Sequence, residues 1–330
     1  MSQVSQATAL PRVGDRVSEY VARVSQLRQI KKREGDGCFY IFKATNANGQ
    51  LGSVVWSDAI DFKNGDYLRL WGEVKPYKDG SQLVVGRWEL LAREDFEPQS
   101  FVPRCPRPLD DMIGELREVV SNVADPWIRR LLTEMLLDDE YLSKAHHNAP
   151  AAKYHHQPYL HGLLEHNLLV VKRAIGLAGD LPVNMSVVVA GALLHDIGKI
   201  EEYAYDGDAI EFSEVGNLIG HIALGYYMTR KAVEAIPGFP SALATQVLHI
   251  ILSHQGRLDF GSPVEPRTAE AFIVHHADSI DAHLFQITRA GSEFPETRLG
   301  WCKSLNRFVL GNPQIAETAP YPYHRTQNGA

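Results

Sequence analysis

Residues 191–199 read Gly-Ala-Leu-Leu-His-Asp-Ile-Gly-Lys, which places a histidine and an aspartate side by side inside an apolar stretch. A buried carboxylate or imidazole is costly unless it is hydrogen-bonded, ion-paired or bound to a metal ion. Gly198 follows the pair and indicates a helix C-cap, which would end the helix so that His195 and Asp196 face a cavity. The stretch therefore predicts a polar site at the end of an apolar helix.

Four more polar side chains stand in apolar stretches on either side of this pair. They are His166 in 163–169, His221 in 218–224, His254 at the end of 247–254, and Asp278 in 272–278. A single histidine of this kind is more often a hydrogen-bonded core residue than a ligand. The whole set, with few lysines or arginines nearby, is better explained by one metal centre. Histidine and carboxylate without thiolate favour Mn²⁺, Fe²⁺, Co²⁺ or Ni²⁺ over structural zinc.

The chain changes character near residue 145, because all 14 histidines lie at or beyond His146. From Leu109 onward the hydrophobic pattern has the period of helices. Helices are expected near 110–124, 126–137, 162–178, 184–197, 216–235, 241–254 and 267–288. We therefore expect an all-α domain over residues 111–312 that holds the metal site.

Residues 13–95 have the pattern of an all-β domain. Stretches rich in β-forming residues alternate with Asn-Gly and Asp-Gly turn signals, at 18–30, 38–42, 50–56, 67–74 and 82–91. Five short strands predict a small closed barrel of the OB type, with an SH3-like barrel as the alternative.

Aromatic and basic residues alternate along this domain. Grooves that bind single-stranded nucleic acid have this mixture, because bases stack on rings and phosphates meet cations. The candidate substrate-binding residues are Lys31, Lys32, Arg33, Tyr40, Trp56, Lys75 and Tyr77. The competing interpretation is that most of the aromatic rings fill the core of the barrel.

Three segments are predicted to flank or join the domains. Residues 1–12 are polar and are expected to form a flexible N-terminus, and residues 96–110 form a proline-rich linker. Residues 313–330 contain few apolar side chains and predict a flexible tail.

Composition narrows the class of protein. The net charge of −7 argues against a protein that coats nucleic acid by charge alone. No apolar stretch is long enough for a membrane span, and the first residues lack an apolar signal core. Cys38, Cys105 and Cys302 are widely spaced and odd in number, which is typical of a reducing compartment. We therefore expect a cytoplasmic protein without membrane contact.

His166, the His195-Asp196 pair and Asp278 resemble the H…HD…D signature of the HD phosphohydrolase superfamily. His221 and His254 resemble the added ligands of its two-metal members. The segments 150–156, 162–166, 191–199, 220–222, 252–254, 261–263 and 275–278 are similar to the YhaM-type 3′→5′ exoribonucleases, which join an OB fold to an HD domain. Two positions depart from that pattern: His161 replaces a glycine, and Gln255 replaces a second histidine.

The resemblance implies a role for each residue of the site. One ion would be held by His166, His195, Asp196 and Asp278, and Asp196 would bridge to a second ion held by His221 and His254. The cofactor would be divalent metal, with two ions expected and Mn²⁺ preferred over Fe²⁺, Co²⁺, Ni²⁺ or Mg²⁺. Asp196, Lys199 and Glu165 would act in catalysis, Lys199 by neutralising phosphate charge and Glu165 by helping to hold the attacking water. His275, Arg257 and Arg267 would contact the substrate.

The sequence thus predicts a metal-dependent 3′→5′ exoribonuclease that acts on single-stranded RNA, or on single-stranded DNA, and releases nucleoside 5′-monophosphates. Two alternatives stay open. One is an HD-type nucleotide or cyclic-dinucleotide phosphohydrolase whose OB domain serves assembly. The other is a non-catalytic single-strand-binding protein. The chain could also form homo-oligomers.

Overall fold

The computed structural model describes residues 11, 13–32, 37–46, 49–77, 80–92, 103–138, 140–153, 156–205, 210–293 and 298–312. The chain divides into two compact units, and the division falls between Pro103 and Arg104. Nearly all of the expected N-terminal segment 1–12, residues 96–102 of the expected linker, the expected tail 313–330 and the candidate Arg33 lie outside the described residues. No helix in the described part of the chain is long and apolar enough to cross a bilayer.

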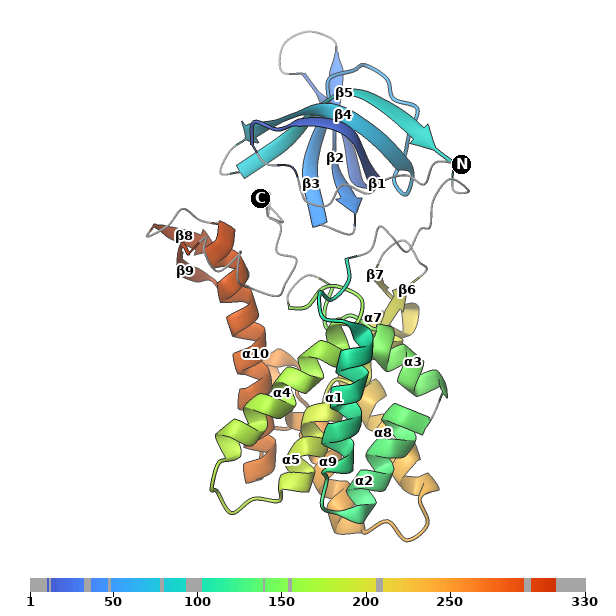
Figure 1. Ribbon diagram of the computed structural model, residues 1–330, viewed down its shortest axis with the longest axis vertical. Coiled ribbons are helices and arrows are strands. Elements are labelled where there is room, and N and C mark those ends of the chain that lie inside the picture. The colour runs from blue at the N-terminus through green and yellow to red at the C-terminus, as the bar shows by residue number, and fades with distance from the viewer. Residues whose placement is uncertain are drawn as a thin grey trace. The chain divides into compact units, whose positions relative to one another are not determined.

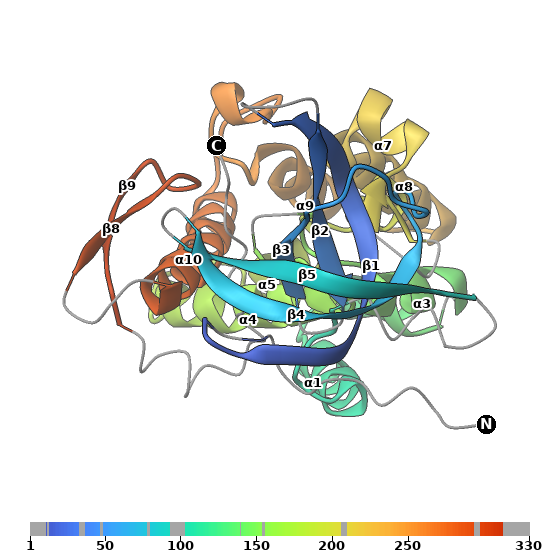
Figure 2. The same cartoon turned by 90° about the horizontal axis from the view of Figure 1, so that it is seen from above.

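The first unit is a closed barrel of five strands (Figures 1 and 2). Its strands are β1 (Arg16–Lys31), β2 (Cys38–Asn46), β3 (Gly49–Val55), β4 (Tyr67–Tyr77) and β5 (Gly80–Leu91). Their order round the barrel is β1-β2-β3-β5-β4, with β4 closing on β1 and with the β3–β5 pair parallel. This closed five-stranded order confirms the predicted OB-type barrel.

The core of the barrel is made of residues that alternate along the strands. Tyr20, Phe42, Leu68 and Leu70 are buried, whereas Glu19, Ile41 and Arg69, each next to one of them in sequence, are half-buried or exposed. The aromatic residues singled out from the sequence are a different set. Phe39, Tyr40, Trp56, Trp71, Tyr77 and Trp88 all retain solvent exposure, and of these Trp88 packs against the core from its edge. The interpretation that these rings fill the core is therefore wrong for most of them.

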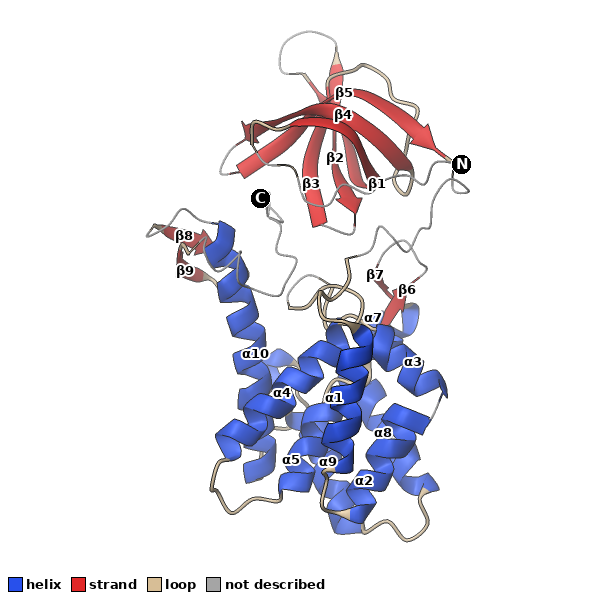
Figure 3. Ribbon diagram, viewed as in Figure 1, coloured by secondary structure: helices blue, strands red, loops and turns tan. Residues whose placement is uncertain are grey.

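The second unit is helical, as Figure 3 shows by colour. Its helices are α1 (Leu109–Ser121), α2 (Pro126–Thr133), α3 (Glu140–Asn148), α4 (Gly162–Ala178), α5 (Met185–Leu194), α6 (Lys199–Glu202), α7 (Glu214–Ile219), α8 (His221–Ala235), α9 (Ser241–Ser253) and α10 (Ala269–Glu293). A π-helical turn (Glu134–Asp138) extends α2. Two short hairpins that the sequence did not predict are β6 (Tyr203–Tyr205) with β7 (Ile210–Phe212), and β8 (Leu299–Cys302) with β9 (Arg307–Leu310).

Helix α5 lies at the centre of this unit. It is apolar all round, and every residue from Ser186 to Leu194 is buried, which is typical of a helix surrounded by others. It packs against α4, α9 and α10. Asn184 caps its first turn by accepting from the backbone N–H groups of Ser186 and Val187. Because α5 ends at Leu194, the His195-Asp196 pair emerges from the middle of the bundle.

Gly198 has a different role from the predicted C-cap. Its φ of −64° is one that any residue adopts, and it precedes α6 instead of ending α5. A Cβ at this position would lie 2.0 Å from the carbonyl oxygen of His221 and 2.5 Å from the backbone nitrogen of Gly225. The glycine is needed because α8 passes directly over it. A second glycine changes another predicted element. The predicted helix 216–235 is divided into α7 and α8 at Gly220, whose φ of +78° favours glycine.

We expect Gly198→Ala to destabilise the helical unit, because the added methyl group collides with backbone atoms of α8. The free energy of unfolding should fall by about 1–3 kcal/mol, as is usual for overpacking. Gly176→Ala is the matched control, because that glycine lies within α4 and a Cβ there meets nothing within 4 Å. The control should gain roughly 0.5–1 kcal/mol. Urea unfolding followed by circular dichroism at 222 nm measures both, and equal stability of the two variants would contradict the steric argument.

Candidate metal centre

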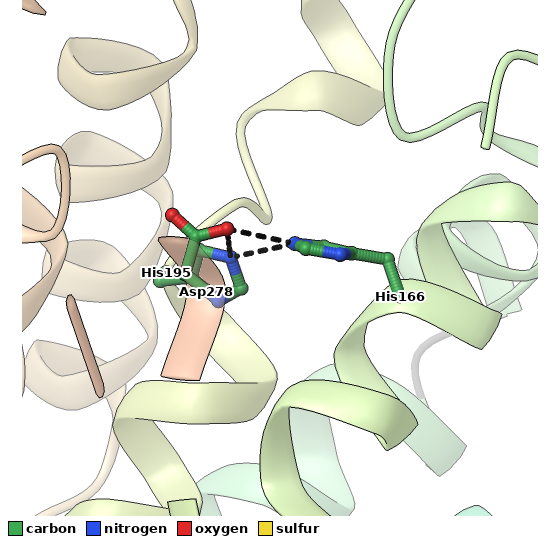
Figure 4. A group of neighbouring side chains, drawn as sticks. All are labelled: His166, His195 and Asp278. Atoms are coloured by element: carbon green, nitrogen blue, oxygen red, sulfur yellow. Dashed lines mark hydrogen bonds and ion pairs between the residues drawn. The ribbon is translucent and has the colours of Figure 1, made fainter. Parts of the chain in front are cut away.

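Two groups of ligand-type side chains meet in the helical unit. The first joins His166 of α4, His195 after α5 and Asp278 of α10, and Figure 4 shows these three pointing toward one another. The second joins Asp196, His221 at the start of α8 and His254 at the end of α9. Within each group the ligand atoms lie within 4.8 Å of one another. All six ligands proposed from the sequence are thus brought together.

Asp196 links the two groups through its two oxygens. Its Oδ1 lies 3.4 Å from Nε2 of His221 and 3.4 Å from Nε2 of His254. Its Oδ2 lies 3.3 Å from Nε2 of His195 and 3.6 Å from Nε2 of His166. One carboxylate therefore faces both groups, which is the position of a bridging ligand between two cations.

Hydrogen bonds fix the orientation of all four imidazole rings. Each ring has its Nδ1 against an oxygen acceptor, so that with a cation bound Nδ1 would carry the proton and Nε2 would present its lone pair to the centre. The acceptors are Asp281 Oδ2 for His166 at 2.7 Å, the Ala192 carbonyl for His195 at 3.0 Å, Glu202 Oε1 for His221 at 2.9 Å and the Ile251 carbonyl for His254 at 2.8 Å.

Several of the inward-facing atoms have no proton donor among the described residues. Oδ1 of Asp196 and Nε2 of His221 are buried without a hydrogen-bond partner. Nε2 of His166 and Nε2 of His195 also lie 3.2 Å apart, so without a cation one of these two ring atoms must carry a proton. Buried lone pairs that converge in this way are costly unless a cation lies among them. The residues present therefore fit divalent metal ions.

The electrostatics of the first group hold its carboxylate ionised. Burial by itself would raise the pKa of Asp278, but the hydrogen bond from His166 and the charge of His195 outweigh it and hold this pKa well below its ordinary value. Burial would likewise lower the pKa of His166, but Asp278 and Asp281 raise it to about 9. Without metal, the proton on His166 takes the place of the missing cation.

Lys199 supplies the fixed positive charge of the site. It is buried, not at the surface, and its Nζ donates to Oδ2 of Asp196 at 2.5 Å. Burial would raise the pKa of Asp196, but Lys199 and His195 overcome this effect and keep the carboxylate ionised. The lysine lines a cavity of about 450 Å³ that also contains Asp196, His221, His254 and Asp278.

Of the remaining candidates in this unit, one reaches the cavity. His275 lines it, and Nδ1 of its ring contacts the carbonyl oxygen of His254 at 2.7 Å. Arg257 is exposed and pairs with Asp259 at 3.0 Å, and Arg267 is also exposed. Neither arginine is among the described residues that line the cavity.

Glu165 lies apart from both ligand groups. It is fully buried, and it accepts a hydrogen bond of 2.5 Å from the Tyr159 hydroxyl. Burial raises the pKa of this carboxyl group despite that bond. Glu165 precedes His166 by one position in the helix, so its side chain leaves α4 in another direction. The described contacts make it a packing partner of Tyr159, and it is not among the described residues that line the cavity of the metal centre.

Asp281 and Glu202 are site residues that the sequence reasoning missed. Asp281 holds the His166 ring, accepts from the Gln157 amide at 2.9 Å and pairs with Arg173 at 2.9 Å. Its position three residues after Asp278, on the same face of α10, was a usable signal. Glu202 holds His221 through both its ring and its backbone N–H. Nothing in its local sequence distinguishes it from a surface glutamate.

In the barrel unit the described candidates lie on the surface. Trp56 is 60% exposed and its ring centroid lies 4.5 Å from that of Phe39. Tyr77 is also exposed, and Tyr40 is half-buried. The candidate cations are accessible, although Lys32 pairs with Asp58 at 3.6 Å and Lys75 with Glu73 at 3.3 Å.

Comparison with known proteins agrees with this geometry. Residues 163–283 match the family described as HD domain, and this range includes all six ligands. The helical unit carries an HD domain. The predicted HD-type helical domain is therefore confirmed over residues 163–283, which include His166, the His195-Asp196 pair and Asp278.

The likeness to curated relatives extends beyond the HD domain. A protein of Bacillus subtilis named 3′-5′ exoribonuclease YhaM is 26% identical over 291 residues, covering 85% of this chain and 89% of the relative. Relatives with the same name from Geobacillus sp. and Listeria innocua are each 28% identical, over 84% and 72% of this chain and 86% and 76% of their own. The predicted resemblance to YhaM-type proteins is confirmed.

One solved structure is similar to the barrel at low identity. It is the second OB-fold domain of replication protein A from Methanococcus maripaludis, with 16% identity and a TM-score of 0.20. The likeness covers 25% of this chain and 88% of that one.

We expect Asp281→Asn to weaken metal binding about 10- to 100-fold, because the His166 ring loses the carboxylate that orients it and makes it more basic. Titration of the metal-free protein with Mn²⁺ in a calorimeter measures the affinity. Glu234→Gln is the control, because Glu234 is exposed on α8 and pairs with Arg230, far from any ligand in sequence and contacts. The control should bind as the wild type does.

The same titration has a proton readout. With a pKa of about 9, His166 is protonated at pH 7.5 in the metal-free protein and must lose that proton to bind a cation. Metal uptake at pH 7.5 should therefore release a proton, and affinity should rise as the pH approaches 9. Since Asp281 helps to raise this pKa, Asp281→Asn should release fewer protons. The number of protons released is obtained by repeating the titration in buffers of different ionisation enthalpy. Identical numbers for wild type and Asp281→Asn would contradict the assignment of the released proton to His166.

Proposed function

We propose that this chain is a metal-dependent 3′→5′ exoribonuclease, which hydrolyses the terminal phosphodiester of single-stranded RNA and also accepts single-stranded DNA. The observation that carries the proposal is the pair of ligand groups joined by Asp196 inside an HD domain. The same chain has an OB-type barrel and is similar over most of its length to proteins named 3′-5′ exoribonuclease. The products would be nucleoside 5′-monophosphates.

The ligand sets support two divalent ions. One would be held by His166, His195 and Asp278, and the other by His221 and His254, with Asp196 shared. Imidazole and carboxylate ligands without thiolate suit Mn²⁺, which we take as the first candidate, with Fe²⁺, Co²⁺, Ni²⁺ and Mg²⁺ as further candidates. Such ions act as Lewis acids on a phosphate and lower the pKa of water.

The protein's own residues would prepare the phosphate for hydrolysis. Lys199 holds a buried positive charge beside Asp196 and within the cavity, where it would offset negative charge developing on the phosphate oxygens. His275 has its Nδ1 engaged with the His254 carbonyl, so its Nε2 is the ring atom left for a substrate group. The rings fixed by Asp281 and Glu202 keep the ligands from rearranging during turnover.

The barrel would bind the strand. Exposed Trp56 and Tyr77, the Phe39 ring beside Trp56 and the surface lysines provide the stacking faces and cations that unpaired nucleic acid uses. Stacking reads no particular base, so binding would tolerate sequence. This agrees with a processing enzyme more than with a reader of one motif.

Two features favour this activity over the alternatives. Among the described residues that line the cavity, Lys199 is the only lysine and there is no arginine, which is a poor charge complement for a free triphosphate. A non-catalytic binding protein would have no need of six convergent ligands with their rings oriented by hydrogen bonds.

Wild-type protein and Asp196→Ala should be incubated with 5′-labelled single-stranded RNA in Mn²⁺ and in EDTA. We expect a ladder that shortens from the 3′ end with wild type in Mn²⁺, and at least about 100-fold slower cleavage by the variant. Glu234→Gln should behave as wild type. Intact RNA with metal bound would refute the exonuclease and favour a small nucleotide substrate. Intact RNA without bound metal would favour a binding protein.

Trp56→Ala should weaken the binding of a long single strand about 5- to 100-fold, which corresponds to loss of one stacked base. Its rate on a dinucleotide should be unchanged, because a substrate that short has no bases beyond those bound at the metal centre. Leu90→Ala is the control, since Leu90 is also an exposed apolar residue of the barrel. Fluorescence anisotropy measures the affinity, and equal effects of the two variants would argue against a stacking role for Trp56.

A further inference from the structure

The cavity beside the metal centre has an exposed aromatic side chain in its wall. Phe260 lies in a short 3₁₀ turn (Leu258–Phe260) between α9 and α10, and it lines the same cavity as Asp196, His254 and Asp278. Its side chain is 62% exposed. A phenylalanine in this position gains nothing from contact with water, so a ligand that covers the ring would be stabilised by the apolar surface it buries.

The turn that carries Phe260 is held in one conformation. The backbone N–H groups of Phe260 and Ser262 donate to the carbonyl oxygen of Arg257, at 3.1 and 3.3 Å. The backbone N–H of Gly261 donates to the carbonyl oxygen of Leu258 at 3.0 Å. Gly256 starts the turn at a φ of +78°, and the His275 ring lies where a Cβ would be, with Cε1 at 2.2 Å. These contacts hold the backbone of the turn that carries Phe260, and the turn begins only two residues after the ligand His254.

A cation accompanies the ring. The guanidinium carbon of Arg257 lies 5.2 Å from the centroid of Phe260, and Arg257 also pairs with Asp259. Arg257 is not among the described residues that line the cavity, so it contacts the ring from outside by a cation–π interaction, while Phe260 itself stays exposed in the cavity wall.

The other exposed ring of the cavity is less available. Phe212 is 40% exposed, but its centroid lies 5.1 Å from that of Tyr203, and Nζ of Lys153 lies 5.8 Å from it. Phe212 thus already has a ring partner, and it is less exposed than Phe260. Phe260 has no second ring against it among the described residues.

We propose that Phe260 stacks on the base of the terminal nucleotide, and that this contact selects a nucleoside phosphodiester over a phosphodiester without a base. The proposal rests on the function proposed above, since it assigns the binding of the substrate to that same cavity. The base is read by its flat face alone, so all four terminal nucleotides are accepted. A paired base cannot rotate onto the ring without leaving its partner, so a duplex end is disfavoured.

The decisive test compares RNA with the same RNA ending in an abasic nucleotide. Phe260→Ala should lower kcat/KM on ordinary RNA about 5- to 100-fold, mainly through KM, as expected for one lost stacking contact. On the abasic substrate the variant and wild type should be equal, because neither can stack. Phe260→Trp should restore ordinary activity. Phe272→Ala is the control, since Phe272 is 56% exposed on α10 but does not line the cavity.

A binding experiment separates this proposal from the proposed function. Calorimetry on the full chain with Mn²⁺ would measure the affinities for AMP and for ribose 5-phosphate. Phe260→Ala should weaken the affinity for AMP by about 5- to 100-fold and leave that for ribose 5-phosphate unchanged. If the wild-type protein leaves RNA intact, the proposed exonuclease activity is refuted. The difference in AMP affinity still tests whether Phe260 stacks on a base. Equal loss on both ligands, equal loss on both RNAs, or no loss in a folded variant would overturn the role of Phe260.

Discussion

The structure of the helical unit depends on burying the carboxylate of Asp196 at the centre of a bundle. An ionised group in such a place must be surrounded by positive charge and proton donors. Lys199 donates to one oxygen, and the other oxygen faces Nε2 of His221 and of His254, among which a cation would lie. Three helix ends converge to provide this surrounding: α5 ends before His195, α8 starts at His221 and α9 ends before His254. The packing of those three helices therefore sets the positions of these ligands.

A layer of hydrogen bonds behind the ligands makes the centre ready for cations before any arrive. Each of the four rings is oriented by an acceptor on Nδ1, two of them carboxylates, from Asp281 and Glu202. These carboxylates add negative charge close to the site, which raises the basicity of the imidazoles and the affinity for a divalent ion. The protonation of His166 in the metal-free protein is the electrostatic consequence of the same charge. Binding and deprotonation are therefore linked.

The two units of the chain suit different parts of one task. The barrel has its large aliphatic and aromatic core residues inside and a second set of rings outside, including Trp56 beside Phe39. Exposed rings on a small barrel contribute no hydrophobic free energy to folding, and a ligand that stacks on them would gain that free energy on binding. The helical unit has the ligand groups and a cavity with Phe260 in its wall. Binding of unpaired bases and hydrolysis of a phosphodiester can thus be tested separately.

The sequence by itself determined the six ligand-type side chains that meet in the two groups, because a histidine or aspartate in an apolar stretch is costly wherever the chain folds. It also determined the five strands, since alternation and turn residues are local signals. Only the tertiary structure decided that Asp196 faces both groups, that Gly198 lets α8 pass instead of capping α5, and that Glu165 points elsewhere. Periodicity gives the face of one helix. The crossing of two helices depends on side chains far apart in the chain, which no local pattern contains.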